Sequence, residues 1–234
     1  MKRTLALGLL LLAACQPAPQ DPAMDEDKAA VLLAAYEAAR AEGDFEIAEA
    51  RADELRQRHG ETRAADSARA SLDAVREQAE AMREARRLRA LWDYQAIPAA
   101  GGIQHTAAIF SHVDVDPSDD PDSATAPLPD AQLILRRHPE WGDSAYLVLA
   151  QRSLQCGPPC TLQIRFDDGE PQRYAGDPAD TGTGPALFIV DRDRFLAQMQ
   201  QARRVRIELP RGDHLVPVFT FEVGGFAPKR HLAD

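Results

Sequence analysis

Three cysteines are the residues of this chain with the most distinctive chemistry: Cys15 near the amino terminus, and Cys156 and Cys160 in the second half. A thiol can be acylated, can be oxidised to a disulfide, or can bind a soft metal ion as its thiolate. Cys15 ends an apolar run, whereas Cys156 and Cys160 enclose the tripeptide Gly-Pro-Pro. An odd number of cysteines cannot all pair within one chain. The two settings therefore predict two different roles.

The amino terminus has the order of features typical of an export signal. Met1-Lys2-Arg3 carries positive charge, and the ten residues Leu5–Ala14 are almost wholly apolar. As a helix they would span about 15 Å, roughly half of a bilayer core, so the run predicts a signal peptide and not a transmembrane helix. It ends in Leu12-Ala13-Ala14-Cys15, which resembles the lipobox of bacterial lipoproteins: a leucine, two small residues and a cysteine.

This resemblance to bacterial lipoproteins implies that Cys15 carries a lipid. In that family the thiol receives a diacylglyceryl group, the signal is cleaved before the cysteine, and the new amine is often acylated. Two or more acyl chains give stable membrane anchoring. Gln16 stands where enteric-type bacteria use aspartate to retain a lipoprotein in the inner membrane. The resemblance therefore implies an outer-membrane location facing the periplasm. The alternative is an ordinary secretory signal with a chance cysteine.

If Cys15 is lipidated, as the resemblance implies, Cys156 and Cys160 remain as a pair in an oxidising compartment, where such a pair forms a disulfide. Their motif is similar to the Cys-Gly-Pro-Cys of thioredoxin-like redox proteins but has one residue more. It also precedes an expected strand, whereas the redox motif opens a helix that lowers the thiol pKa. A structural disulfide is favoured. The alternatives are a redox pair, or a copper site of the Cys-x3-Cys kind completed by His214 or His231.

The acidic clusters have sufficient local explanations. The pair Asp167-Asp168 is expected in a turn, and Asp191 and Asp193 are expected at the start of a helix. Glycoside hydrolysis would instead need two carboxylates at a set separation in a cleft. Five further aspartates lie in a proline-rich loop that lacks the glycine and the distal glutamate of an EF-hand calcium loop: Asp114, Asp116, Asp119, Asp120 and Asp122.

Other polar groups also lack a site. His105 and His112 are seven residues apart, which places them on opposite faces of an expected strand, so they cannot share a metal ion. Arg211-Gly212-Asp213 matches the integrin-binding tripeptide but is expected as a hairpin turn. Ser111 and Ser153 lie in no motif that would activate a nucleophile. The sequence thus predicts no catalytic residue, no metal and no cofactor.

The charge balance of the 234-residue chain is acidic, with a net charge of −10. This disfavours nucleic acid and anionic lipid as partners, because phosphate binding needs clustered Lys and Arg. The length allows one or two domains. We expect a signal peptide at 1–14, a lipidated Pro/Gln-rich tether at 15–24, a helical module at 25–95 and a β-rich domain at 96–234.

The expected helical module contains no proline, and its only glycines are Gly43 and Gly60. Good helix formers dominate it, so the two glycines predict three helices, at about 25–41, 45–59 and 62–94. Residues 28–61 resemble a single tetratricopeptide repeat, through the turn glycine Gly43, the aromatic Phe45 and the small Ala48. No second copy follows 34 residues later, whereas repeat arrays need about three units.

Pro98 and Gly101-Gly102 end the helical half. Strands are expected at 103–113, 131–137, 145–150, 161–166, 186–190, 205–209 and 216–223. Asp191 is expected to cap one short helix. The predicted fold class is α+β: an N-terminal three-helix module followed by a mostly antiparallel β domain, a sandwich or a partly open barrel, with one short helix.

These features predict a membrane-anchored envelope lipoprotein that is not an enzyme and serves as a protein-interaction or structural component. Its partners would be the membrane, through the lipid, and another envelope protein that binds the helical module. One alternative is a periplasmic redox or metal-handling protein that uses Cys156 and Cys160. Another is a lipoprotein that binds a small ligand in the β domain. The lack of a catalytic constellation favours the first function.

Overall fold

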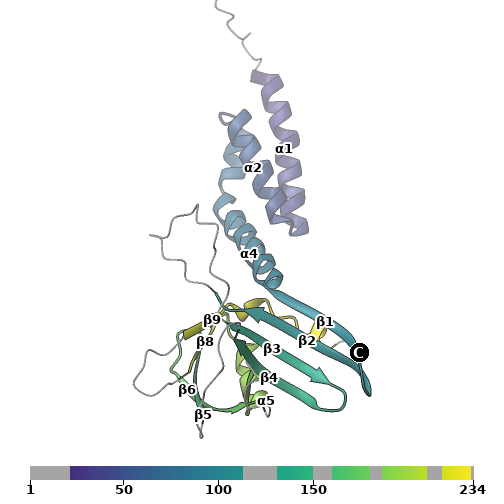
Figure 1. Ribbon diagram of the computed structural model, residues 1–234. Coiled ribbons are helices and arrows are strands. Elements are labelled where there is room, and N and C mark those ends of the chain that lie inside the picture. Colours follow the sequence, from purple (N-terminus) through teal and green to yellow (C-terminus); the bar gives the residue numbers. More distant parts are fainter. Residues whose placement is uncertain (1–21, 113–130, 150–159, 180–185, 210–217, 233–234) are drawn as a thin grey trace, which may run out of the picture. The chain divides into compact units, whose positions relative to one another are not determined.

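The computed structural model describes residues 22–112, 131–149, 160–179, 186–209 and 218–232 (Figure 1). The chain divides into two compact units, residues 1–81 and 82–234. Helices come first and an antiparallel sheet follows, so the predicted α+β class is confirmed. Within the described ranges, no helix has both the length and the apolar character needed to cross a membrane.

The first unit is helical. It contains α1 (Pro22–Glu42), α2 (Phe45–Arg58), α3 (Arg63–Arg69) and the start of α4 (Leu72–Ala90). Gly43 turns the chain between α1 and α2 with a φ of +82°, a conformation that favours glycine. Small side chains dominate the core of this unit, which lets the helices approach closely: Ala29, Ala39, Ala48, Ala52, Ala64 and Ala68.

The prediction of one long third helix is wrong, because the chain breaks at Ala70–Ser71 and forms α3 and α4. Thr62 caps α3, with its hydroxyl accepting a hydrogen bond from the backbone N–H of Ala65. At the break, the hydroxyl of Ser71 lies 2.6 Å from that of buried Tyr36. A buried hydroxyl needs a partner, and Ser71 supplies it at a position where the sequence has no glycine or proline.

The second unit is built on one nine-stranded sheet in the order β1-β2-β3-β4-β7-β6-β5-β8-β9. Every pairing of neighbouring strands in it is antiparallel. The strands are β1 (Trp92–Ala99), β2 (Gly102–Phe110), β3 (Ala131–His138), β4 (Gly142–Leu149), β5 (Cys160–Phe166), β6 (Gln172–Pro178), β7 (Ala186–Ile189), β8 (Val205–Glu208) and β9 (Val218–Phe221).

The sheet curls into a half-barrel. Just beyond β2, the backbone N–H of His112 donates to the carbonyl of Thr220 in β9, with an N–O distance of 2.6 Å. This bridge joins the second strand to the last one (Figure 1). Of the two architectures left open by the sequence, the partly open barrel is therefore the one that forms.

The apolar core of the second unit lies on the inner face of the half-barrel. Strands β3, β4 and β5 bury every second residue, as the two-residue period of a strand dictates. Helix α5 (Arg192–Met199) packs against β4 and buries Phe195 and Met199. Asp191 caps this helix as predicted, by accepting a hydrogen bond from the backbone N–H of Arg194.

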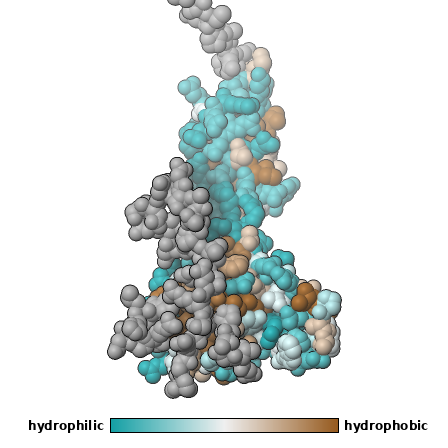
Figure 2. Space-filling model, viewed as in Figure 1, coloured by the Kyte–Doolittle hydropathy of each residue, from teal (hydrophilic) through white to brown (hydrophobic). Residues whose placement is uncertain are grey.

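The surface seen in Figure 2 is mostly hydrophilic, with smaller hydrophobic patches.

Two strands were not expected from the sequence, β1 and β6. β1 begins where the third helix was expected to continue, and Trp92 at its start is buried in the sheet's core. Pro98 lies inside β1, which is tolerated because β1 is an edge strand.

The last described part of the chain forms a 3-10 turn, η1 (Val223–Gly225), and a short helix, α6 (Pro228–Leu232). Helix α6 packs against β2.

Candidate functional site

A row of polar side chains crosses one end of the half-barrel. His105 of β2 is opposite Arg137 of β3, and Arg137 is opposite Asp143 of β4. Because side chains alternate along a strand, these residues share the inner face with the buried Ala107, Leu135 and Ala145. The row therefore lies where the apolar core ends.

Two guanidinium groups approach the carboxylate of Asp143. The Nη2 atom of Arg192, at the start of α5, lies 2.9 Å from Asp143 Oδ2. The Nε atom of Arg137 lies 3.6 Å from Asp143 Oδ1, which is too long for a hydrogen bond and leaves an ion pair. Arg192 also contacts the largely exposed Asp193. Two cations and one carboxylate thus meet at the edge of the core.

His231 of α6 lies close to this row. Only 2% of its surface is exposed, and neither ring nitrogen has a hydrogen-bond partner among the described residues. Burial lowers the pKa of His231 to about 4; the nearby Asp143 opposes this shift, and the charges of Arg192 and Arg137 add to it. The imidazole is therefore neutral at pH 7. A hydrogen bond from the backbone N–H of Ala227 to the Tyr94 hydroxyl (2.7 Å) helps to hold α6 in place.

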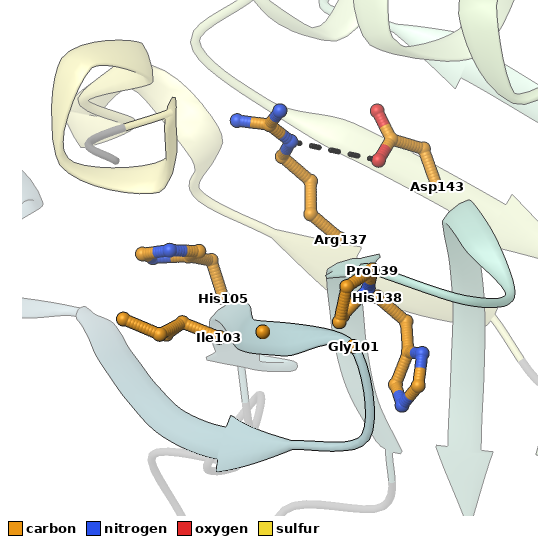
Figure 3. A pocket seen from close by; sticks show the side chains of 8 residues that line it. Gly101, Ile103, His105, Arg137, His138, Pro139 and Asp143 are labelled. Carbon is orange, nitrogen blue, oxygen red and sulfur yellow. Dashed lines mark ion pairs between the residues drawn. The ribbon is translucent and has the colours of Figure 1, made fainter.

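A cavity of about 430 Å³ opens beside the polar row (Figure 3). His105, Arg137 and Asp143 line it together with Ile103 and the β1–β2 turn. The turn glycines Gly101 and Gly102 have φ angles of +82° and +147°, so side chains are disfavoured at this rim. In Figure 3 the ring of His138 points away from Arg137 and Asp143. We refer to this cavity as the end pocket.

The outer face of the same strands carries a stack of aromatic and cationic groups. Trp141, in the β3–β4 turn, has 70% of its surface exposed. Its ring stacks on His138, with 3.9 Å between centroids and 10° between planes. The guanidinium carbon of Arg136 lies 5.5 Å from the ring centroids of both Trp141 and Tyr146, and Tyr146 contacts Phe188 at 5.0 Å. We refer to these five residues as the aromatic stack.

The aromatic stack is rigidly supported. His138 is buried, and its Nδ1 accepts hydrogen bonds from the backbone N–H groups of Glu140 and Trp141. These bonds fix the imidazole on which the Trp141 ring lies. The guanidinium group of Arg136 adds a stabilising cation–π contact with the Trp141 ring. The Trp141 side chain is thus held in one orientation although most of it faces solvent.

The cysteine predictions fall only partly within the described residues. Cys15 and Cys156 lie outside them. Cys160 is the first residue of β5 and is 7% exposed. A side chain on Gly176, its partner in β6, would place a Cβ 2.7 Å from the sulfur of Cys160. Gly176 therefore makes room for that sulfur, and the disulfide with Cys156 stays a prediction.

The local interpretation of the acid pairs is confirmed. Asp167 lies in the turn after β5 with a φ of +49°, and its carboxylate accepts hydrogen bonds from the backbone N–H groups of Arg203 and Arg204, both at 2.9 Å. Asp168 is exposed and pairs with Arg204. These carboxylates shape a turn and do not meet in a cleft.

The remaining candidate residues from the sequence either have a simple structural role or lie outside the described residues. Ser111 is buried, and its hydroxyl accepts a hydrogen bond from the backbone N–H of Ala131. His112 bridges to β9, at the opposite end of β2 from His105. The other candidates lie outside the described residues: the aspartates between 114 and 122, Ser153, residues 211–213 and His214. Where the structure is described, no three His, Cys, Asp or Glu residues are grouped so that they could hold a metal ion.

Sequence reasoning missed both the end pocket and the aromatic stack. The sequence patterns single out His105 and His231 only as possible metal ligands, and they do not point to Arg136, Arg137, Trp141 or Asp143. One signal was available for Arg137. It continues the inward-facing positions of Leu133 and Leu135, and a charged residue on a core-facing position of a strand needs an explanation.

Comparison with known proteins identifies no relative: no family model, no curated protein and no solved structure matches this chain.

Proposed function

We propose that the protein is a lipid-anchored component of the bacterial envelope, not an enzyme, that binds another envelope protein. The anchor is supported by the order of charge, apolar run, Leu12-Ala13-Ala14 and Cys15 at the amino terminus. The absence of an aspartate after Cys15 supports the outer membrane, with the folded units facing the periplasm. Cys156 and Cys160 form a structural disulfide in this proposal.

The single observation that carries the binding function is the aromatic stack. A tryptophan with 70% of its surface in water leaves a large apolar area that a partner can cover. Tryptophan, tyrosine and arginine dominate the binding energy of protein interfaces. Since Trp141 is already fixed by His138 and Arg136, it loses little conformational freedom when a partner binds. We therefore propose the aromatic stack, on the sheet, as the surface that binds the partner, in place of the helical module that the sequence indicated.

The chemistry of the stack favours a partner with a carboxylate beside apolar side chains. Arg136 lies near the rings of Trp141 and Tyr146, and guanidinium groups combine such ring contacts with paired hydrogen bonds to carboxylates. Tyr146 and Phe188 add apolar surface next to it. An acidic protein segment with aliphatic neighbours therefore fits better than a phosphate-rich or purely apolar surface.

Two observations favour this function over the alternatives. Side chains fill the inner face of the half-barrel, where Leu133, Leu147 and Phe195 are fully buried. The apolar core is therefore occupied by the protein's own side chains, which disfavours a ligand chamber inside it. Cys160 is buried at the start of a strand, whereas redox cysteines are partly exposed and usually open a helix.

Site-specific photo-crosslinking in living cells tests the binding function. A photoreactive phenylalanine analogue replaces Trp141 in one strain and the exposed Glu170, in the β5–β6 turn, in a control strain. We expect one protein to be crosslinked from position 141 and not from 170, and Arg136→Glu to abolish that adduct. Equal adducts from both positions, or an adduct that Arg136→Glu leaves unchanged, would contradict the proposed surface.

A separate experiment tests the anchor. Cells fed an alkyne-labelled fatty acid should label the wild-type protein, and Cys15→Ser should abolish the label and leave an unprocessed precursor. Cys160→Ser is the matched control, and it should keep the label. Unlabelled wild-type protein would contradict the lipoprotein assignment without bearing on the aromatic stack.

A further inference from the structure

We propose that the partner's acidic segment continues beyond the aromatic stack to a second set of cations on the outer face of the sheet. These cations are Arg165 of β5, Arg173 of β6 and Arg206 of β8, which we call the arginine group. The inference rests on the proposed function and specifies the partner. Its segment carries a carboxylate for Arg136, then apolar side chains, then further carboxylates for the arginine group.

All three arginines lie on the outer face of the half-barrel. In each strand a neighbouring residue is buried on the inner face: Ile164, Tyr174 and Ile207. Because side chains alternate between the two faces of a strand, the arginines point outward. Arg165 is directly opposite Arg206 in the β5–β8 pair. Arg173 is opposite Gln163, which lies two residues from Arg165 in β5. The three guanidinium groups therefore share one region of the surface.

The arginine group has no counter-ion among the described residues. None of its side chains forms a hydrogen bond, an ion pair or a ring contact there. Like charges directly opposite each other on neighbouring strands are destabilising, as Arg165 and Arg206 are. The Nε of Arg165 is also shielded from water and lacks a described hydrogen-bond partner, whereas buried polar groups are normally paired. A partner's carboxylate would relieve both costs.

The carboxylates nearby do not neutralise the arginine group. Glu208 of β8 and Asp177 of β6 also face outward, yet neither forms an ion pair with a described residue. Glu170 continues the inward-facing positions of Gln172 and Tyr174, so it lies toward the other side of the sheet. Because two carboxylates interrupt the cations, a uniformly anionic membrane surface fits this face less well than a protein segment does.

An exposed apolar strip joins the aromatic stack to the arginine group. Two residues after Phe188 of the stack, Val190 has 61% of its surface exposed. The backbone N–H of Val190 donates a hydrogen bond to the carbonyl of Ala175. Ala175 is exposed and lies two residues from Arg173 on the same face of β6. One segment of a partner can therefore contact both sets of cations without leaving the surface.

The sheet sets the length and the form of that segment. Arg136 in β3 and Arg206 in β8 are five strand spacings apart, along β3-β4-β7-β6-β5-β8. At about 4.8 Å each, these spacings amount to about 24 Å, which an extended chain covers with about seven or eight residues. The outer face of a curled sheet is convex, so a straight helix would touch only part of it. An extended segment, acidic towards both ends and aliphatic between, therefore fits best.

Fluorescence anisotropy of the full-length protein with the dye-labelled peptide Asp-Glu-Val-Leu-Val-Leu-Glu-Asp tests this inference. We expect saturable binding that weakens with salt, and none for the peptide in which Asn and Gln replace the acids. Arg206→Glu should weaken binding at least about ten-fold, as for the loss of charge-assisted hydrogen bonds. It should also leave the melting temperature unchanged or raise it, because an ion pair with Arg165 replaces two opposed cations. A purely structural role for Arg206 predicts the opposite change in melting temperature.

Lys229→Glu is the matched control, because Lys229 is exposed on α6 and the charge change is the same. It should keep the affinity. If Arg206→Glu proves unfolded by circular dichroism, Arg173→Glu takes its place. No saturable binding, or equal losses in Lys229→Glu, would overturn the inference. So would binding to phosphatidylglycerol vesicles, but not to the peptide, that Arg206→Glu abolishes.

Trp141→Ala separates this inference from the proposed function. We expect it to weaken peptide binding as Arg206→Glu does, because the segment contacts both surfaces. Peptide binding that depends on Trp141 and not on Arg206 would keep the aromatic stack and overturn the role of the arginine group. Failure of the proposed function is read separately, from the absence of a partner adduct at position 141 in cells.

Discussion

At the scale of single residues, His231 makes the stability of the second unit depend on pH. Its pKa in the folded protein is about 4, below the ordinary 6.5. As pH falls below 6.5, the unfolded chain takes up a proton that the folded protein does not bind until about pH 4. The stability that the neutral His231 provides is therefore complete above pH 6.5 and is lost as pH falls to about 4.

We predict that His231→Phe reduces this pH dependence. The difference in unfolding free energy between variant and wild type should shift in favour of the variant by up to about 3 kcal/mol from pH 7 to pH 4. Both tryptophans, Trp92 and Trp141, belong to the second unit, so urea unfolding followed by their fluorescence measures it. A difference that is the same at both pH values would contradict the burial of a neutral imidazole.

Also at the residue scale, we predict a Cys156–Cys160 disulfide in protein taken from the envelope. The bond closes a loop of only five residues, so its contribution is at most about 2 kcal/mol, and replacing both cysteines with serine should lower the melting temperature modestly. Alkylation before and after reduction, read by mass spectrometry, measures the bond. Two thiols that are alkylated without reduction would show that the disulfide is absent. Rapid exchange with a dithiol reductant would instead favour the redox alternative.

At the scale of elements, the end of α4 and the turn η1 touch so closely that only glycine fits between them. A Cβ on the buried Gly225 would lie 2.2 Å from the carbonyl carbon and oxygen of Leu88, and 2.4 Å from the backbone nitrogen of Arg89. Backbone atoms cannot rotate away as a side chain can. Either η1 or the last turn of α4 must therefore move when this residue gains a side chain.

We predict that Gly225→Ala destabilises the second unit by about 1–3 kcal/mol, as overpacking does elsewhere. Gly224→Ala is the matched control. Gly224 is exposed, and its nearest contact to a Cβ is 3.3 Å, so it should cost less. Thermal unfolding monitored by tryptophan fluorescence compares the two variants. Equal melting temperatures would show that the contact with Leu88 relaxes freely.

At the scale of the whole molecule, the second unit includes the last turns of α4. Arg87 pairs with Glu222, with a 2.7 Å contact from its Nη2 to Glu222 Oε1. Leu88 is buried, and its side chain lies near Gly224. These contacts explain why the division of the chain falls at residue 82, ahead of β1. An isolated β fragment should therefore keep this piece of helix.

We predict that a fragment starting at Met82 folds alone, with a β-rich circular dichroism spectrum and cooperative unfolding. A fragment starting at Leu91 should be less stable, because it lacks Arg87 and Leu88. Arg87→Ala in the longer fragment should cause only a small part of that loss, since a partly exposed ion pair contributes little. A helix-dominated spectrum, or equal stability of both fragments, would contradict this boundary.

The sequence by itself determined the α+β class, the turn at Gly43 and the α5 cap at Asp191. It also predicted most strands, because each of these depends on neighbours in the chain. Alternation of apolar residues is legible in β3, and a capping aspartate acts within one helical turn. The predicted lipid anchor at Cys15 is a local pattern of the same kind, and it awaits its experiment.

Only the tertiary structure decided the features that depend on distant residues. Trp92 fits the seam of a helix through Leu88, yet pairing with Ile109 makes it a strand residue. Ser71 interrupts a run of good helix formers where it meets Tyr36. The end pocket needs β2, β3 and β4 in register, and the aromatic stack needs β4 beside β7. Residues far apart in the chain become neighbours only through strand pairing and helix packing, so a local pattern could mark a single residue such as Arg137 but not the grouping of residues at these sites.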